Sequence, residues 1–321
     1  MLMVKKFGGT SVANKEKIFN VANRCIEDYK KGNKIVLVLS AMGKHTDELV
    51  SLANEINSNV PKREMDMLFT VGEQITVSLM AMAFDKLGIP AISLNAFQVR
   101  MLTDNNYGDS KIIKIETERI KKELEENKIV IITGFQGIDS NNNYTTLGRG
   151  GSDTTAACLA AALKADSCEI YTDVEGVFTA DPRIVNDALK LETISYNEML
   201  EFSNLGAGVL HNKSVQIAKE NNIKLIVRSS MSRTDGTTVS NFCKKLCNLP
   251  KITGVTSNGN VISIVGIDID TETKEKVIEV LNKNNLKFNN LDKTNMHISV
   301  TVNEEDVNAS IRCIHDLFFK R

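Results

Sequence analysis

The sequence Ile35-Val36-Leu37-Val38-Leu39 runs directly into Ser40-Ala41-Met42-Gly43. A short, continuous apolar run that ends in a turn is typical of a β-strand buried on both faces of a parallel sheet. Similar runs recur over the first two-thirds of the chain, and longer helical patterns separate them. We expect strands at 3–7, 34–40, 91–94, 129–134, 168–173 and 224–228, and helices at 15–31, 46–57, 63–87, 116–126, 153–164 and 211–221. This alternation predicts an α/β fold in which helices sandwich a mostly parallel sheet, and ligands bind such folds at the carboxyl ends of the strands.

The composition changes after residue 248, where Asn, Lys and Ile become frequent and Gly becomes less so. The pattern there predicts the order β-β-α-β-β-α, with strands at 252–257, 261–267, 286–292 and 297–302 and helices at 272–284 and 304–319. We therefore predict two domains: residues 1–247, and a small α+β domain at 251–321 that follows a linker at 248–251. If the strongly β-forming segment 261–265 lies at a sheet edge, we expect the tail to dimerise through its sheets.

The charge and composition exclude several classes of protein. The 321 residues include 39 Lys+Arg and 40 Asp+Glu, so the chain lacks the basic excess that coats a nucleic acid. No uninterrupted apolar run approaches about 18 residues, which predicts no transmembrane helix and no membrane partner. Residues 1–7 lack the apolar region of a signal peptide, so we expect a cytoplasmic protein. The cysteines and histidines are scattered, and no second pair completes the half-site that Cys243 and Cys247 could form, so we predict no metal ligands.

Two glycine-containing loops carry residues suited to phosphate binding. Lys6-Phe7-Gly8-Gly9-Thr10-Ser11 follows the first strand, and paired glycines let backbone N–H groups approach an anion. A Lys at the strand end offers the charge that a transferring phosphoryl group needs, whereas the alternative is a tight turn capped by Thr10 or Ser11. Ser-Ala-Met-Gly-Lys-His-Thr at 40–46 could supply another phosphate contact. Because Val38 stands where a P-loop has its first glycine, a Walker-type ATPase is not expected.

The segment 145–153, Thr-Thr-Leu-Gly-Arg-Gly-Gly-Ser-Asp, is the most informative loop. It combines Arg149, a bidentate binder of carboxylates, with three glycines and an acid, Asp153, at a helix start. We interpret it as a functional loop, the alternative being that Asp153 serves only the helix dipole. The segment 172–183 also follows a strand, and it either grips an adenine and its ribose or forms a long surface loop. Gly72-Glu73 lies in an apolar helical stretch, where Glu73 either binds a cation or favours the helix start.

Together these segments resemble those of the aspartokinases, within the amino-acid-kinase superfamily. The matches follow the family's order over residues 3–240: Lys-Phe-Gly-Gly-Thr-Ser at 6–11, Ser-Ala-Met-Gly-Lys-His-Thr at 40–46, Gly-Glu at 72–73, Gly-Phe-Gln-Gly at 134–137, the segment 145–153, and Thr-Asp-Val-Glu-Gly-Val-Phe-Thr-Ala-Asp-Pro-Arg at 172–183. The tail resembles an ACT regulatory module. The resemblance implies ATP-dependent phosphorylation of the β-carboxylate of L-aspartate to 4-phospho-L-aspartate, the first step of the aspartate-family amino-acid pathway, with ATP and Mg²⁺ as cofactors.

The resemblance also implies roles for individual residues. Lys6 would stabilise the transferring phosphoryl group, and Asp153 would help to organise the reacting centre. Arg149 would hold the α-carboxylate of aspartate, and Glu73 and Asp153 would receive its ammonium group. The implied substrate-binding residues are Thr46, Glu73, Arg149, Ser152 and Asp153, and the implied nucleotide-binding residues are Lys6, Gly8, Gly9, Ser40, Gly43, Thr172, Asp173, Phe178, Asp181 and Arg183.

The chain departs from the family's pattern in two places. Where the family usually has Gly-Ala-Lys-Val-Leu-His-Pro, this chain has Gly-Ala-Gly-Val-Leu-His-Asn at 206–212. Gly208 thus replaces a nucleotide-contacting Lys, and Lys213 is a candidate substitute. The family usually carries two ACT modules, whereas residues 251–321 provide one. We therefore expect a homodimer or higher homo-oligomer in which lysine or threonine, the effectors that the resemblance suggests, inhibits weakly or not at all.

Two alternatives remain open. Another kinase of the superfamily would phosphorylate glutamate, acetylglutamate or a nucleotide, but Arg149 together with two acids favours a free amino acid over an N-acetylated one. A non-catalytic amino-acid sensor would keep the fold and the tail without turnover, which the loss of a Lys at Gly208 makes conceivable. The presence of Lys6, Arg149 and Asp153 favours the enzyme.

Overall fold

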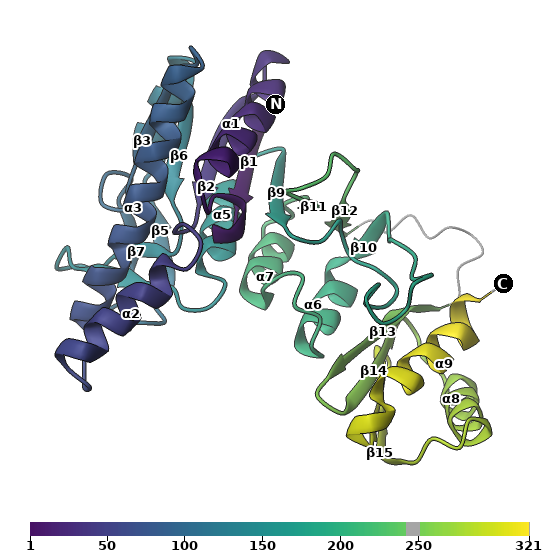
Figure 1. The fold of residues 1–321 in the computed structure, drawn as a ribbon. Helices are drawn as coiled ribbons and strands as arrows, with labels where there is room; N and C mark the ends of the chain where they lie inside the picture. Colours follow the sequence, from purple (N-terminus) through teal and green to yellow (C-terminus); the bar gives the residue numbers. More distant parts are fainter. Residues whose placement is uncertain (242–250, 321) are drawn as a thin grey trace. The chain divides into compact units, whose positions relative to one another are not determined.

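The chain folds into two compact units, seen in the computed structural model, which describes residues 1–241 and 251–320 (Figure 1). The first unit comprises residues 1–174 and 213–235, and the second comprises 175–212 and 236–321. Cys243, Cys247 and most of the predicted linker lie outside the described residues. The division at 248–251 therefore stays a prediction. By contacts, the segment 175–212 belongs with the C-terminal residues, because Ala180 and Val185 join their core.

A parallel sheet forms the centre of the first unit. Its strands there follow the order β11-β9-β1-β2-β6-β3, and every neighbouring pair is parallel. The strands are β1 (Leu2–Phe7), β2 (Lys34–Leu39), β3 (Ala91–Leu94), β6 (Ile129–Thr133), β9 (Ser167–Thr172) and β11 (Leu225–Ser229). Each begins and ends within one residue of its predicted bounds. The predicted α/β class is confirmed.

Helices cover both faces of this sheet. Side chains alternate along each strand, so Phe7, Leu37 and Ile131 face one side and join a core cluster with α1 (Lys15–Lys30) and α3 (Lys62–Lys86). The other side receives α5 (Gly151–Leu163), whose many alanines allow close packing against the strands. The same alternation sends the neighbouring side chains of Lys5 and Lys6 to opposite faces of β1. Helices α2 (His45–Ile56), α4 (Glu118–Glu125) and α7 (Asn212–Glu220) complete the predicted helical set.

A second, smaller sheet in the first unit has no counterpart among the predicted strands. Its order is β5-β4-β7-β8, from β4 (Met101–Thr103), β5 (Ile112–Ile115), β7 (Gln136–Ile138) and β8 (Tyr144–Thr146). These strands have three or four residues each and no continuous apolar run, so no hydrophobic period marks them. A turn at 140–143 joins β7 to β8.

Helix α3 is long and apolar enough, by length and composition alone, to cross a membrane, whereas the sequence predicted no such helix. Its inner side is part of the core of the first unit, where Val77, Met80 and Phe84 are buried. The same helix buries two acids, Asp66 and Glu73, among polar partners. These contacts are those of a core helix.

The second unit contains a small antiparallel sheet with two helices. The sheet order is β13-β14-β16-β15, from β13 (Ile252–Asn258), β14 (Val261–Gly266), β15 (Phe288–Lys293) and β16 (His297–Val302). Helices α8 (Thr271–Lys283) and α9 (Val307–Phe319) contribute apolar side chains to its core. The predicted β-β-α-β-β-α order is confirmed. The segment 261–265 is not at an edge, because β14 lies between β13 and β16.

The segment before this sheet also belongs to the second unit. It forms β10 (Thr193–Ser195), which pairs in parallel with β12 (Thr237–Ser240), and α6 (Tyr196–Asn204). A capping box begins α6: the Ser195 hydroxyl accepts from the Glu198 N–H, and the Glu198 carboxylate accepts from the Ser195 N–H. These short elements were not among the predicted ones.

Candidate active site

A cavity of about 660 Å³ opens in the first unit where the loops after β1, β2 and β8 meet. Its size falls within the range of small-molecule sites. The lining residues are Lys6, Gly8, Gly9, Ser40, Ala41, Gly43, Thr46, Asp47, Phe69, Glu73, Gly108, Phe135, Thr146, Gly148, Arg149, Gly150, Gly151, Ser152 and Asp153. All five residues predicted to bind the substrate are among them, together with the first five of those predicted to bind the nucleotide.

Lys6 and Asp153 form the ion pair at the centre of this cavity. The Lys6 Nζ atom lies 2.7 Å from Asp153 Oδ1, and both side chains are mostly buried. Lys6 stands near the end of β1, and Asp153 lies in the first turn of α5, whose partial positive charge favours a carboxylate there. Strand and helix thus hold a cation and an anion side by side at the wall of the cavity.

The loops after β1 and β2 are joined through their backbones. The Gly43 N–H donates to the Gly9 carbonyl over 3.0 Å, and a Cβ on Gly9 would lie 2.6 Å from the Ala41 carbonyl oxygen. Only glycine fits such a close approach. Ser40 and Ser152 meet through their hydroxyl groups at 2.9 Å, which ties the β2 loop to α5. The result is a fixed wall of small residues and backbone amides.

Glu73 projects from α3 into the cavity as a buried carboxylate with a free oxygen. Its side chain is 3% exposed, and Oε1 accepts a hydrogen bond from the Ala41 N–H at 3.0 Å. In the described part of the chain, Oε2 has no hydrogen-bond partner. Burial raises the pKa of Glu73 to about 7, because no nearby cation compensates for the lost hydration. An oxygen in this state can accept a hydrogen bond from a ligand.

Arg149 lies on the rim of the same cavity, in the loop between β8 and α5. Gly148 and Gly150, on either side of it, have φ of +72° and +69°, so the loop takes a left-handed path that side chains rarely adopt. Arg149 is exposed, and no side-chain contact engages its guanidinium within residues 1–241 and 251–320. It is available to a planar anion such as a carboxylate.

Asp66 supports the cavity and was not singled out from the sequence. It is 1% exposed on α3 and accepts hydrogen bonds from the Thr146 N–H at 2.8 Å, the Thr146 hydroxyl at 2.7 Å and the Gly108 N–H at 3.0 Å. Thr146 and Gly108 both line the cavity. Burial raises the pKa of Asp66 above its usual range, although these donors oppose the shift. The sequence does contain a pattern that could have indicated Asp66, because Asp66, Thr70, Glu73 and Val77 recur on one helical face.

The remaining predicted nucleotide residues lie outside the lining of this cavity. Thr172 and Asp173 follow β9 in the first unit, where the Thr172 hydroxyl donates to the Asp173 carboxylate at 2.9 Å. Phe178, Asp181 and Arg183 belong to the second unit. Arg183 pairs with Asp181 at 2.6 Å, and this contact lowers the pKa of Asp181.

Within the second unit, the segment that carries Phe178 and Asp181 is held from several sides. The Thr179 carbonyl accepts from the Val255 N–H at 2.7 Å, and the Thr179 hydroxyl lies 2.9 Å from His315 Nε2 of α9. The Leu189 N–H also donates to that hydroxyl at 2.9 Å. The C-terminal sheet and helix therefore fix the backbone of the predicted nucleotide segment.

Gly208 stands where the family usually has a nucleotide-contacting Lys, and the structure shows what surrounds this position. A Cβ on Gly208 would meet nothing within 4 Å, so the position has room for a side chain. Lys213, the candidate substitute, pairs with Asp109 beside the cavity residue Gly108. Its ammonium group is therefore engaged near the rim.

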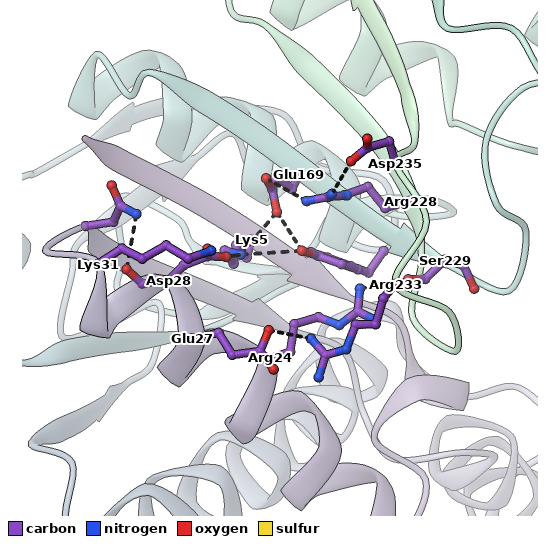
Figure 2. A network of polar contacts seen from close by, with 12 residues as sticks. Lys5, Arg24, Glu27, Asp28, Lys31, Glu169, Arg228, Ser229, Arg233 and Asp235 are labelled. Atoms are coloured by element: carbon purple, nitrogen blue, oxygen red, sulfur yellow. Dashed lines mark hydrogen bonds and ion pairs between the residues drawn. The ribbon is translucent and has the colours of Figure 1, made fainter.

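A buried polar network lies on the opposite face of β1 (Figure 2). Lys5 is fully buried and contacts Asp28 of α1, Glu169 at 3.2 Å and the Tyr171 hydroxyl. Burial alone would lower the pKa of Lys5, but the surrounding Tyr171, Glu169 and Asp28 outweigh it and raise the pKa. Arg228 reaches Glu169 from β11 at 3.4 Å. The network joins β1, β9, β11 and α1, and so fixes the strand from which Lys6 projects.

Comparison with known sequences identifies the relatives of this chain. The profile of the amino acid kinase family matches residues 1–229. The chain is 60% identical over 238 residues to the aspartokinase of Bacillus sp. (strain MGA3), covering 74% of this chain and 58% of that protein. It is 46% identical over 318 residues to aspartokinase 2 of Bacillus subtilis (strain 168), covering 97% of this chain and 78% of that protein. The chain thus spans less than two-thirds of the first relative and about three-quarters of the second.

Comparison with solved structures gives the same fold. The structure of E. coli aspartokinase III in complex with aspartate and ADP matches with a TM-score of 0.84 at 22% identity, covering 100% of both chains. At this identity the likeness shows the fold, which includes the small antiparallel domain predicted for the C-terminal residues.

Proposed function

Because this chain belongs to the amino acid kinase family, and within it to the aspartokinases, we propose that it transfers the γ-phosphoryl group of ATP to the β-carboxylate of L-aspartate. The product is 4-phospho-L-aspartate. The observation that carries the proposal is one cavity that holds the Lys6–Asp153 ion pair, the exposed Arg149 and the buried Glu73. L-aspartate carries one ammonium group and two carboxylates, and these charges match the two cations and the two acids of the cavity.

The substrate is bound through its two ends. Arg149 binds the α-carboxylate with two parallel N–H···O bonds, which its guanidinium can form because no side chain in the described part of the chain engages it. The ammonium group lies between Glu73 Oε2 and Asp153, so it supplies the partner that the buried Glu73 oxygen lacks. Thr46 and Ser152 line the cavity as neutral hydrogen-bonding groups. The β-carboxylate is then directed towards Lys6.

The chemical step requires positioning and charge compensation. A β-carboxylate with a pKa of about 3.9 is ionised at neutral pH and attacks phosphorus without a general base. Lys6 and the backbone N–H groups around Gly8, Gly9 and Gly43 stabilise the charge that spreads over the phosphoryl oxygens. Ser40 lines the same wall, where its hydroxyl donates a hydrogen bond to the Ser152 hydroxyl.

The nucleotide is assigned to the residues after β9. Thr172, Asp173, Phe178, Asp181 and Arg183 match the family's nucleotide segment. Thr179 lies between them and is held by β13 through its carbonyl and by α9 through its hydroxyl. Mg²⁺ belongs to the proposal as a partner of the phosphates. Asp153 fits such a hard cation, because beyond its ion pair with Lys6 its Oδ1 has no hydrogen-bond partner in the described chain. When bound, Mg²⁺ neutralises charge on the phosphate oxygens.

The alternative functions are two kinases with another phosphoryl acceptor and a non-catalytic sensor. A kinase for N-acetylglutamate would leave the buried Glu73 without an ammonium partner from its substrate, which disfavours it. A kinase for glutamate would need space for one more methylene between Arg149 and Lys6. A non-catalytic sensor would bind aspartate without ATP turnover.

The test is a coupled assay of ADP release with L-aspartate, L-glutamate and N-acetylglutamate as acceptors. We expect turnover with L-aspartate, trapped as its hydroxamate, and at least roughly tenfold lower kcat/KM with L-glutamate, since one methylene is worth about 1–3 kcal/mol in a tight pocket. Aspartate binding without ADP release, measured by calorimetry, identifies a sensor instead.

Regulation and assembly complete the proposal. The C-terminal sheet has the predicted ACT-like order, and lysine or threonine are the candidate effectors at it. Its edge strands are β13 and β15, so tail-to-tail pairing into a homodimer or higher homo-oligomer would use one of these. The proposed substrates are metabolites of the cytoplasm, which is the location we assign to the protein.

A further inference from the structure

Three side chains able to bind a metal ion meet beside α9 in the second unit. His315 and Asp316 are neighbours on α9, whereas Asp187 lies far earlier in the chain, between β9 and β10. One ring nitrogen of His315 and one carboxylate oxygen of each aspartate lie within 4.8 Å of one another. We call these three residues the α9 cluster. The spacing in the sequence gave no sign of it, because only the fold brings Asp187 to the other two.

The imidazole of His315 is buried, and its two ring nitrogens have different surroundings. The residue is 1% exposed, and Nε2 lies 2.9 Å from the Thr179 hydroxyl. Among residues 1–241 and 251–320, Nδ1 has no hydrogen-bond partner. A buried polar atom without a partner is costly. When Nε2 carries the proton and donates it to Thr179, Nδ1 keeps a lone pair that can bind a metal ion.

The carboxylates of the α9 cluster exceed the positive charge that pairs with them. Within the described chain, the ion pair at this cluster is that of Lys320 with Asp316, at 2.8 Å across one turn of α9. Asp187 is exposed and contributes a second negative charge. Two carboxylates beside one ammonium group attract a further cation, and their exposure gives it a path from the solvent.

The backbone that carries Asp187 is held against α9. Val185 is 3% exposed and belongs to the same core cluster as Ile311 and Ile314 of α9. The Arg312 Nε atom, also on α9, donates to the Ile184 carbonyl at 2.9 Å. Ligands on elements that are already fixed lose little freedom when an ion binds them.

We propose that the α9 cluster binds Zn²⁺ through His315 Nδ1 and one carboxylate oxygen each of Asp187 and Asp316. An imidazole nitrogen among the ligands favours a transition-metal ion over Mg²⁺ or Ca²⁺, which prefer oxygen ligands. Three protein ligands leave the fourth position of a tetrahedral ion to water. The ion displaces the Lys320 ammonium group from Asp316. This site is separate from the one that the phosphates of ATP would share with Mg²⁺.

Zinc at this place clamps the segment around Asp187 to α9. The Leu189 N–H, two residues after Asp187, donates to the Thr179 hydroxyl at 2.9 Å, and the same hydroxyl contacts His315. The ion therefore fixes both neighbours of Thr179, which lies within the segment assigned to the nucleotide. This last consequence rests on the proposed function, whereas zinc binding itself does not.

Calorimetric titration of the full chain with zinc chloride, without ATP or aspartate, tests the site. All samples carry Cys243→Ser and Cys247→Ser, so that this pair of thiols does not contribute. We expect one site, which Asp187→Asn weakens at least roughly tenfold, because the loss of even an indirect partner of a metal costs that much. Asp292→Asn, which alters an exposed carboxylate on β15, is the matched control and should bind zinc as before. Equal zinc affinity in the Asp187→Asn and Asp292→Asn variants overturns the proposal.

Lys320 provides a test of opposite sign. Because its ammonium group competes with the ion for Asp316, Lys320→Met should tighten zinc binding roughly two- to fivefold. Weaker zinc binding by Lys320→Met overturns the proposal. Magnesium chloride should give no binding that Asp187→Asn abolishes, and such binding would overturn the assignment to a transition-metal ion.

X-ray absorption at the zinc edge of the one-to-one complex identifies the ligands. We expect nitrogen and oxygen neighbours at about 2.0–2.2 Å, with the multiple scattering of one imidazole ring. A sulfur neighbour at about 2.3 Å would assign the zinc to other cysteines and overturn the proposal.

Discussion

Two lysines that are adjacent on β1 have opposite surroundings. Lys5 is enclosed by three partners that fix its charge within the fold, whereas Lys6 has one carboxylate partner and a cavity in front of it. The alternation of a strand is enough to produce this difference. The ion pairs of Lys5 are enclosed on all sides, whereas the Lys6–Asp153 pair keeps a side open to the cavity.

Replacement of Lys6 should separate binding from chemistry. Lys6→Ala removes the charge that acts on the phosphoryl group in the transition state, a loss of roughly 3–4 kcal/mol, or about 10²–10³ in kcat. We expect the KM for aspartate to change little. Steady-state kinetics with both substrates varied provide the measurement, and near-normal kcat would remove Lys6 from the chemical step.

Arg149 should be sensitive to an exchange that preserves its charge. Arg149→Lys cannot reproduce two parallel hydrogen bonds to a planar carboxylate, so aspartate should bind at least roughly tenfold more weakly. ATP affinity should be unchanged in calorimetry. The reverse result, with intact aspartate affinity and lost ATP affinity, would exchange the two subsites.

Glu73 predicts a pH dependence of both stability and binding. Its pKa is raised to about 7 in the fold. Between the ordinary pKa of a glutamate and this value, the folded protein therefore holds a proton that the unfolded chain has lost. The stability of the ligand-free protein should therefore fall as the pH rises from about 5 to 8, by up to roughly 3 kcal/mol from this group. Aspartate affinity should rise over the same window, because the ionised carboxylate binds the ammonium group.

Glu73→Gln provides the control for this behaviour. It keeps the shape of the side chain and removes its titration, so the denaturant midpoint of the variant should change less between pH 5 and pH 8 than that of the unmodified protein. A slope equal to that of the unmodified protein would assign the dependence to another group.

At the scale of elements, α3 is the support of the cavity. Asp66 links it to β8 and to the loop at Gly108 through three hydrogen bonds, two of them to backbone N–H groups. Without the carboxylate those donors are buried and unpaired, which costs more than the hydrogen bonds themselves contribute.

Asp66→Ala should therefore destabilise the protein by roughly 2–4 kcal/mol and raise the KM for aspartate. Asp85→Ala, on the exposed end of the same helix, is the matched control and should shift stability by less than about 0.5 kcal/mol. Denaturant melts of both variants make the comparison. Equal effects would mean that Asp66 has no special role.

The elements that could be predicted from the sequence are those with a hydrophobic period. Continuous apolar strands such as β2 and β6 and long helices such as α1 and α3 were located to within a residue or two. The short strands β4, β7 and β10 were missed, because three residues cannot establish a period. In the site, motif residues such as Arg149 were recognised from their glycine context, whereas Asp66 acts on backbone atoms that only the fold brings near.

At the scale of the whole molecule, the predicted nucleotide segment depends on the C-terminal residues. Ala180 and Val185 are part of the core that the tail sheet and α9 build, and Thr179 is held by Val255 and His315. Removal of the tail should therefore affect more than regulation.

Deletion of residues 251–321 should weaken ATP binding at least roughly tenfold, because segment 175–191 loses the surface that orders it. Lys6 and Arg149 keep their positions in the first unit, so aspartate binding should be preserved. Calorimetric titrations of both ligands against the full and shortened chains provide the measurement. Unchanged ATP affinity in the shortened chain would show that the segment orders itself.

The first unit draws its strands from two separated stretches, and this has a consequence during synthesis on the ribosome. Strand β9 ends at residue 172, but its neighbour β11 begins only at residue 225. Until those later residues leave the exit tunnel, nascent chains present β9 as an open edge that can pair with a neighbouring chain. At about 5–20 residues per second this interval lasts several seconds. We therefore expect chaperones to bind the nascent protein over that interval, and its yield to depend on them when translation pauses there.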